Sequence, residues 1–199
     1  MTSTILNGIE YEEIPPPRSL WRATKYIHAL DLIEKGRLYL TNAQSYREDS
    51  DPERGDATET DGTFIRQGVR CKTGHTNPIF LWCTTLESNA DAVLAIWRDH
   101  DTVVHIRDPH AFAQRIMMAA KAKGIEGVSF HAGSTTYDKE RGGMRPYHWA
   151  ESIYQKPERY GTQKEYRFAL IGDYSMIGLE KVELLLGSCN DLVVVAKSL

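Results

Sequence analysis

Cysteine is scarce in this sequence, and its spacing excludes two common kinds of structural site. The 199 residues include only Cys71, Cys83 and Cys189. The number is odd and no CxxC or Cys/His ligand spacing occurs, so neither a disulfide framework nor a structural zinc ion is expected. Free thiols are typical of a reducing cytosol.

Long apolar runs and a surplus of positive charge are missing as well. No apolar stretch approaches the roughly 20 residues of a membrane span, so no membrane contact is expected. The opening residues, MTSTILNGIEYEE, are polar and acidic and lack the features of a secretory signal, which predicts a cytoplasmic protein. The net charge is −3, whereas proteins that coat duplex nucleic acid usually carry a basic surplus. A local basic pocket for a nucleotide remains compatible with this composition.

The length suits one domain with a substantial core. Residues 1–18 predict an irregular arm, because Pro15-Pro16-Pro17 favours polyproline geometry, and residues 19–199 predict one domain of the α/β or α+β class. Apolar periodicity and capping residues predict strands at 19–23, 37–41, 79–85, 102–106, 127–137, 164–171, 182–186 and 192–196, with helices at 24–35, 89–97, 108–123 and 149–158.

Two polar stretches, 42–78 and 138–147, predict long loops, which in compact domains are often functional. The first contains an acidic run that is either a solvated surface or a divalent-metal cluster, as in a nuclease: Glu48, Asp49, Asp51 and Glu53. The second contains basic residues that either contact phosphates or belong to a plain loop: Lys139, Arg141 and Arg145.

Three short motifs stand at the ends of expected strands. They are Leu20-Trp21-Arg22-Ala23, Trp82-Cys83-Thr84-Thr85 and Gln163-Lys164-Glu165. Because alternate residues of a strand face the same side, Gln163 and Glu165 are expected side by side. Each motif also has an ordinary structural interpretation: Arg22 in a surface ion pair, the threonines as plain strand residues, and Glu165 paired with Arg167 or Lys164 on an exposed strand.

The three motifs, in this order, resemble the ADP-ribosyltransferase family in its Arg–Ser/Thr–Glu, cholera-toxin-like branch. That family places an arginine on its first strand, a Ser-Thr-Ser-type triplet on a middle strand, and a Glu-x-Glu or Gln-x-Glu pair on a late strand. The resemblance implies an α+β fold, a split β-sandwich of two small sheets with flanking helices. It also implies a mono-ADP-ribosyltransferase that uses NAD as substrate, without a metal, and modifies a protein or nucleic-acid target.

The residue types suit this chemistry. Cleavage of the bond between nicotinamide and ribose develops positive charge on the ribose, which a carboxylate such as Glu165 stabilises. The fork of donors on Arg22 fits the pyrophosphate. Thr84 or Thr85 would hold the ribose, and Gln163 would orient the incoming nucleophile. Tyr46 is a candidate for stacking on nicotinamide, and Tyr160 for recognising the target.

Longer pieces of the chain look like a bacterial and phage domain family of unknown function that is associated with abortive infection. These pieces are GRLYLTNAQSYRED, IFLWCTT, KPERYGTQKEYRF and LLLGSCNDLVVV. They imply a role in phage–host conflict, as a toxin or as a defence or anti-defence factor. Two positions depart from the transferase pattern. Cys83 replaces the first serine of the triplet, and Gln163 replaces a glutamate that accompanies modification of arginine.

Two other functions remain open from the sequence. The chain could be a non-catalytic factor that binds a nucleotide or a protein on the same fold, or a metal-dependent nuclease that uses the acidic run. The aromatic residues Trp82 and Trp97 are expected in the core.

Overall fold

The computed structural model describes residues 3–6, 9–12, 17–50, 55–66, 69–73, 75–125, 129–137 and 149–199. Their centre is an eight-stranded sheet in which all seven strand pairings are antiparallel. The strand order is β13 (Lys181–Leu185), β4 (Arg37–Asn42), β7 (Ile79–Thr85), β3 (Leu20–Thr24), β8 (Thr102–Ile106) and β14 (Val193–Ser198), while β12 (Glu165–Ile171) pairs with β7 and with β9 (Ser129–Ser134). The fold class is therefore α+β, as predicted.

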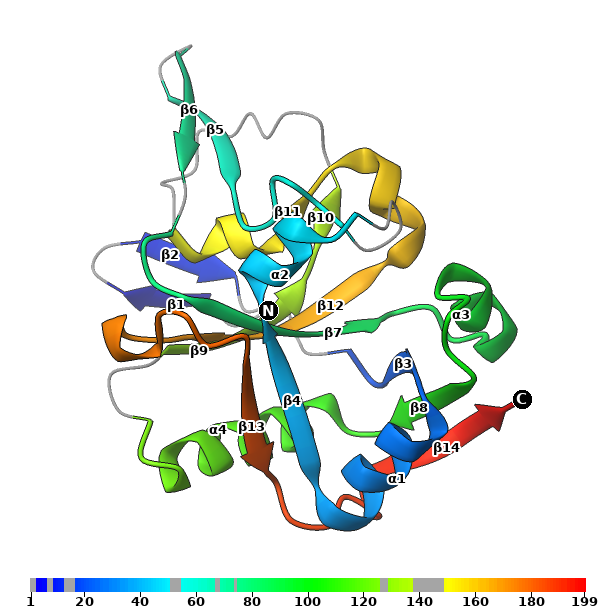
Figure 1. Ribbon diagram of the computed structural model, residues 1–199. Helices are drawn as coiled ribbons and strands as arrows, with labels where there is room; N and C mark the ends of the chain where they lie inside the picture. Colours follow the sequence, from blue (N-terminus) through cyan, green and yellow to red (C-terminus); the bar gives the residue numbers. More distant parts are fainter. Residues whose placement is uncertain are drawn as a thin grey trace.

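The sheet forks at β7. One edge of β7 pairs with β12 along its whole length. The other edge is shared, because β4 pairs with Phe80 and Leu81 and β3 pairs only with Thr85. Residues 82–84 therefore have no strand partner on this edge. Figure 1 shows β4 and β3 meeting β7 at separate points.

Helices α1 (Tyr26–Lys35) and α4 (Pro109–Ala122) cover one face of the sheet. Their apolar residues join the largest core cluster, which includes Leu32, Leu38, Trp82, Val104, Phe112, Ile116 and Phe168. Because both faces of the sheet are covered here, β12 is buried at every position, including the charged residues Glu165 and Arg167 at its start.

The opposite face is covered by two separate units. Over β7 and β12 lie α2 (Ala43–Glu48) and the 3₁₀ helix η1 (Trp149–Tyr154), with Ala43 and Ile153 in the core. Over β3 and β8 lies α3 (Ala90–Ile96), with Val93 and Leu94 in a smaller cluster. The side chains that lie between α2 and α3 on this face are directed to the fork, the place where β4 and β3 separate along β7.

Several helix ends agree with the sequence signals. Asp108 caps α4 with Pro109 in the first turn, and Asn89 caps α3. Gly36 ends α1 with φ of 65°, and a Cβ there would lie 1.9 Å from the carbonyl oxygen of Gly187, so both conformation and space require glycine. The α1 N-cap is Lys25, one residue later than the predicted Thr24.

Two predicted irregular regions contain regular structure. Residues 1–18 include β1 (Ser3–Leu6) and β2 (Ile9–Glu12), which form an antiparallel pair. Residues 42–78 include α2 and a second antiparallel pair, β5 (Gly62–Arg66) and β6 (Val69–Thr73). Local pairing satisfies the backbone of these polar segments without a large core. The predicted loop at 138–147 lies outside the described residues.

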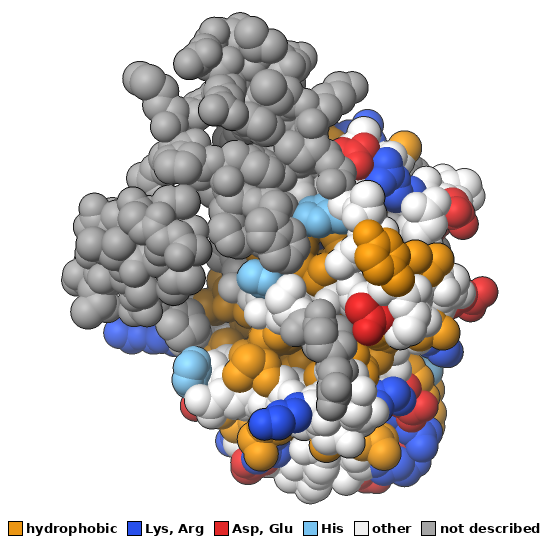
Figure 2. Space-filling model, turned by 90° about the vertical axis from the view of Figure 1, so that its left-hand side faces the viewer, with side chains coloured by type: hydrophobic (Ala, Val, Ile, Leu, Met, Phe, Trp, Pro, Cys, Tyr) orange, Lys and Arg blue, Asp and Glu red, His pale blue; other side chains and the backbone are white. Residues whose placement is uncertain are grey.

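The remaining elements are short. A parallel pair, β10 (Thr136–Tyr137) and β11 (Gln155–Lys156), precedes the 3₁₀ helix η2 (Glu158–Gln163), and η3 (Tyr174–Met176) follows β12. In the described part of the chain, no helix has the length and apolar character needed to span a bilayer. On the face in Figure 2, the basic and acidic side chains of the described residues are interspersed rather than gathered.

Candidate functional site

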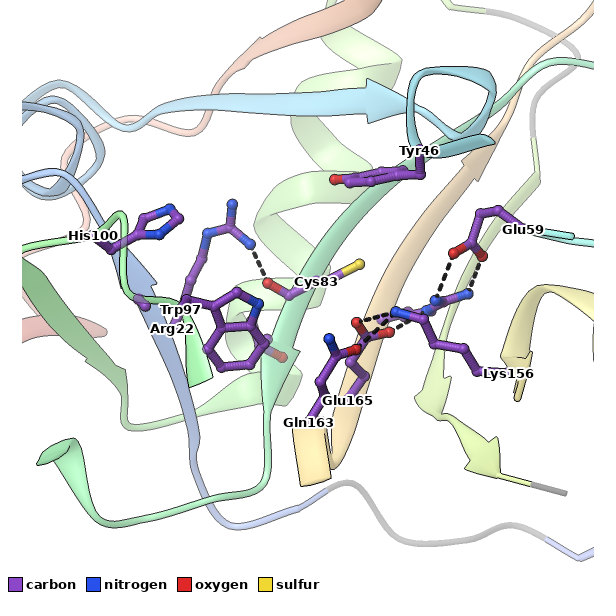
Figure 3. Close-up of a pocket in the computed structure, with 12 residues that line it drawn as sticks. Arg22, Tyr46, Glu59, Cys83, Trp97, His100, Lys156, Gln163 and Glu165 are labelled. Carbon is purple, nitrogen blue, oxygen red and sulfur yellow. Dashed lines mark hydrogen bonds and ion pairs between the residues drawn. The ribbon is translucent and has the colours of Figure 1, made fainter. Parts of the chain in front are cut away.

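A pocket of about 170 Å³ opens at the fork of the sheet (Figure 3). Five of the six residues predicted as site residues line it: Arg22, Tyr46, Thr84, Gln163 and Glu165. They come from β3, α2, β7 and the segment that enters β12. Residues that are far apart in the sequence therefore line one cavity.

Arg22 fills the gap between β3 and β4. Its Nη1 donates a hydrogen bond to the carbonyl oxygen of Cys83, which lies on the unpaired edge of β7. Its guanidinium carbon lies 4.9 Å from the centre of the Trp82 ring, which adds a cation–π contact. No ion pair of Arg22 is found within the described ranges, so the interpretation of Arg22 as half of a surface ion pair has no support. Arg22 instead provides an uncompensated positive charge in the pocket wall.

Thr84 and Thr85 have different roles. The Thr84 hydroxyl donates to the Tyr166 carbonyl oxygen at 2.8 Å, and the residue lines the pocket. The Thr85 hydroxyl donates to the Gln163 carbonyl oxygen at 2.7 Å and accepts from the Glu87 amide at 3.0 Å. Thr85 is not among the residues that line the pocket, and its hydroxyl fixes the backbone before Glu165.

Glu165 lies within a buried chain of charges at the pocket floor. Its Oε1 accepts from Lys156 Nζ at 2.9 Å and its Oε2 accepts from Arg167 Nε at 2.8 Å. Arg167 continues the chain through its two terminal nitrogens to Glu59, at 2.6 and 3.1 Å, and also donates to the Ile153 carbonyl oxygen at 2.5 Å. None of the four side chains is more than 6% exposed. We call these residues, Glu59, Lys156, Glu165 and Arg167, the ion-pair chain.

The ion-pair chain sets two basic against two acidic side chains, and this pairing offsets the cost of burying them. Burial alone would raise the pKa of Glu165, but the charges and hydrogen bonds of Arg167 and Lys156 outweigh it and hold this pKa at about 2. Burial lowers the pKa of Arg167, and Glu59 and Glu165 more than reverse this, so that its pKa lies above the ordinary value. Glu165 is therefore a carboxylate at any physiological pH.

Gln163 lies beside Glu165, as predicted, although the strand argument was wrong. Gln163 ends η2, and Lys164 takes a left-handed conformation with φ of 43° before β12 begins. The two side chains converge because both accept from Lys156 Nζ, Gln163 through Oε1 at 2.8 Å. Of the two partners considered for Glu165, Arg167 is confirmed, whereas Lys164 pairs with Glu87 at 2.8 Å.

Aromatic side chains and a neutral thiol complete the pocket wall. Tyr46 and Trp97 lie on opposite sides of the cavity in Figure 3, and Trp97 was expected in the core. Burial, followed by the charge of Glu165, raises the pKa of Cys83 to about 12, so its thiol stays protonated and is no nucleophile at neutral pH. Burial also lowers the pKa of His100, which therefore lines the pocket mainly as a neutral ring.

Sequence reasoning missed five lining residues: Glu59, Trp97, His100, Lys156 and Arg167. Arg167 carried a signal, since it stands two residues after Glu165 on the same strand face. Glu59 and Lys156 carried none, because Glu59 belongs to an irregular segment and Lys156 to a two-residue strand, and the path of both depends on the folded domain.

Two other expectations concern residues near the site. Tyr160 is only 4% exposed and donates its hydroxyl to the Gly55 carbonyl oxygen at 2.5 Å, so its assignment to target recognition is corrected to a packing role. Among the described residues, no group of three His, Cys, Asp or Glu side chains could hold a metal ion. Two members of the acidic run, Asp51 and Glu53, lie outside those residues.

No protein-family model, curated protein or solved structure matches the chain.

The ion-pair chain predicts a loss of stability in acid. The pKa of Glu165 is about 2 in the folded protein and near 4.5 when unfolded, so the unfolded state binds more protons between these values. We expect the free energy of unfolding, measured with urea, to fall as the pH falls from about 4.5 to 2. The double variant Glu165→Gln with Lys156→Met should show a shallower decline. Equal pH dependence of both proteins would contradict the charge assignment.

Proposed function

We propose that the protein is a mono-ADP-ribosyltransferase that binds NAD at the fork of the sheet and transfers ADP-ribose to a macromolecule. The observation that carries the proposal is the convergence of Arg22, Thr84, Gln163 and Glu165 on one pocket. The fork itself supports an ADP-ribosyltransferase-like division of the sheet, with β4 and β13 on one arm and β3, β8 and β14 on the other.

The proposed reaction breaks the bond between the nicotinamide nitrogen and ribose C1′. The bonding electron pair leaves with nicotinamide, and positive charge develops on the ribose. A nucleophilic atom of the acceptor then bonds to C1′ and releases its proton to solvent. Glu165 suits this reaction because it remains ionised and lies at the pocket floor, where its charge stabilises the developing cation.

The ion pairs of Glu165 leave room for a ribose hydroxyl. A carboxylate offers about four lone-pair positions on its two oxygens, and Lys156 and Arg167 occupy one on each oxygen. The other wall residues match the remaining parts of the ligand. Arg22 would contact the pyrophosphate, Tyr46 and Trp97 would pack on nicotinamide, and Gln163 would orient the acceptor.

The direct test is incubation with NAD labelled in its ADP-ribose part, together with a cell lysate. We expect release of nicotinamide and transfer of label to protein or nucleic acid. The identity of the labelled acceptor would also test the role in phage–host conflict. Absence of both transfer and NAD hydrolysis would contradict the proposal.

One observation favours a second candidate, a non-catalytic nucleotide-binding factor. The Lys156 ammonium lies 2.9 Å from Glu165 and opposes a positive charge that develops nearby. This candidate predicts NAD binding without cleavage, and an affinity that Glu165→Gln leaves unchanged.

A further inference from the structure

A second hollow adjoins the pocket through Arg22. It measures about 350 Å³ and lies in the gap between β3 and β4, where Leu32, Leu38 and Val104 of the large core cluster form part of its lining. Arg22 lines both the hollow and the pocket, because it lies in the gap between β3 and β4. We call this hollow the Lys181 groove. Its polar lining includes Arg22, His28, Arg37, Tyr39, Thr41 and Lys181.

The Lys181 groove is basic, although the protein as a whole is acidic. Among the residues that the structure describes, no Asp or Glu lines it, while two arginines, a lysine and a histidine do. Arg37 is compensated from outside the groove by Glu183 at 2.9 Å and Asp31 at 3.8 Å. Neither Arg22 nor Lys181 has a carboxylate partner in the described part of the chain. Two uncompensated cations thus line one groove, and phosphate is the anion that such donors commonly bind.

The sizes of the pocket and of the Lys181 groove also favour a ligand that extends from one into the other. The pocket, at about 170 Å³, is smaller than the roughly 300–1,000 Å³ of cavities that enclose drug-sized ligands. A dinucleotide with its nicotinamide end beside Glu165 must therefore place its other half elsewhere. The Lys181 groove adjoins the pocket beyond Arg22. Its lining includes the flat ring of Tyr39 and the hydroxyl-bearing residue Thr41. The Lys181 ammonium lies 4.9 Å from the centre of the Tyr39 ring, and Thr41 lies on the same strand.

We infer that the Lys181 groove binds the adenosine 5′-phosphate half of the dinucleotide. Arg22 at the junction contacts the pyrophosphate, Lys181 contacts the phosphate from the far side, and Tyr39 packs against the adenosine. The site thereby selects dinucleotides over mononucleotides. The inference rests on the proposed NAD site, and the experiment below separates the two.

The experiment measures calorimetric affinities for NAD, AMP and nicotinamide mononucleotide with the full chain. Lys181→Met is the test variant, and Lys121→Met, which removes a charge from an exposed position of α4, is the matched control. Loss of one charge-assisted contact should weaken NAD and AMP binding by about tenfold or more in Lys181→Met, with nicotinamide mononucleotide unaffected. Lys121→Met should bind all three ligands as the wild type does.

The remaining outcomes distinguish the two proposals. Suppose that Lys181→Met binds NAD as tightly as the wild type, while Arg22→Ala no longer binds NAD. This result would overturn the groove assignment and leave the proposed function standing. If the wild type binds neither NAD nor nicotinamide mononucleotide, the proposed function fails. AMP binding that Lys181→Met weakens would then still support the groove, and absence of AMP binding would overturn it as well.

Discussion

Glu165→Gln is expected to reduce NAD turnover by about 10²–10³-fold, the size of effect seen when one electrostatic contact to a transition state is removed. The amide keeps the shape of the side chain but carries no charge to stabilise the ribose cation. Release of nicotinamide from saturating NAD measures the effect. Turnover within a few-fold of the wild type would remove Glu165 from the chemistry.

A loss of activity in this variant must be separated from a loss of folding. Glu165 is only 5% exposed and compensates two buried cations. Its removal leaves the ion-pair chain with a surplus positive charge, which is strongly destabilising. Adding Lys156→Met to Glu165→Gln restores the charge balance. The double variant should regain stability relative to Glu165→Gln and remain inactive.

Arg167→Met is expected to lower the free energy of unfolding by about 3–5 kcal/mol, because it leaves Glu59 buried without its cation and removes one of the two cations of Glu165. Urea denaturation measures this loss. Arg115→Met is the matched control, since Arg115 forms an ion pair with Asp191 at the surface and its loss should cost about 0–1 kcal/mol. Equal effects of the two substitutions would show that the ion-pair chain does not stabilise the fold.

Local patterns were enough to predict the framework of the fold. The strand at Ile79–Thr85 and the helix that begins after Asp108 agree with the structure because their signals, an apolar run and a capping sequence, lie within a few residues. Residues 42–78 were harder. Their polar composition predicted a long loop, whereas the structure has α2 and the β5–β6 pair there, and Glu59 becomes buried because Arg167 approaches it from a strand 108 residues away.

The candidate site also combines residues that local patterns could predict with residues whose place depends on distant contacts. The motif residues on β3, β7 and β12 could be predicted because strand order brings them together. The choice between Thr84 and Thr85 depended on hydrogen bonds to Tyr166 and Gln163, which are contacts across the sheet. Lys156 lies in a two-residue strand, β11, which is too short for a periodic signal.

The gap in the sheet gives Arg22 two competing tasks. Its guanidinium substitutes for a missing neighbour strand by satisfying the Cys83 carbonyl oxygen. The phosphate of the proposed ligand would draw on the same group, and five N–H donors in a planar fork allow one nitrogen to keep the carbonyl while the others turn to the ligand. The ammonium of a lysine, a single compact charge, has no second nitrogen with which to divide these duties. Arginine at this position would thus keep the open edge of β7 hydrogen-bonded while the proposed ligand is held.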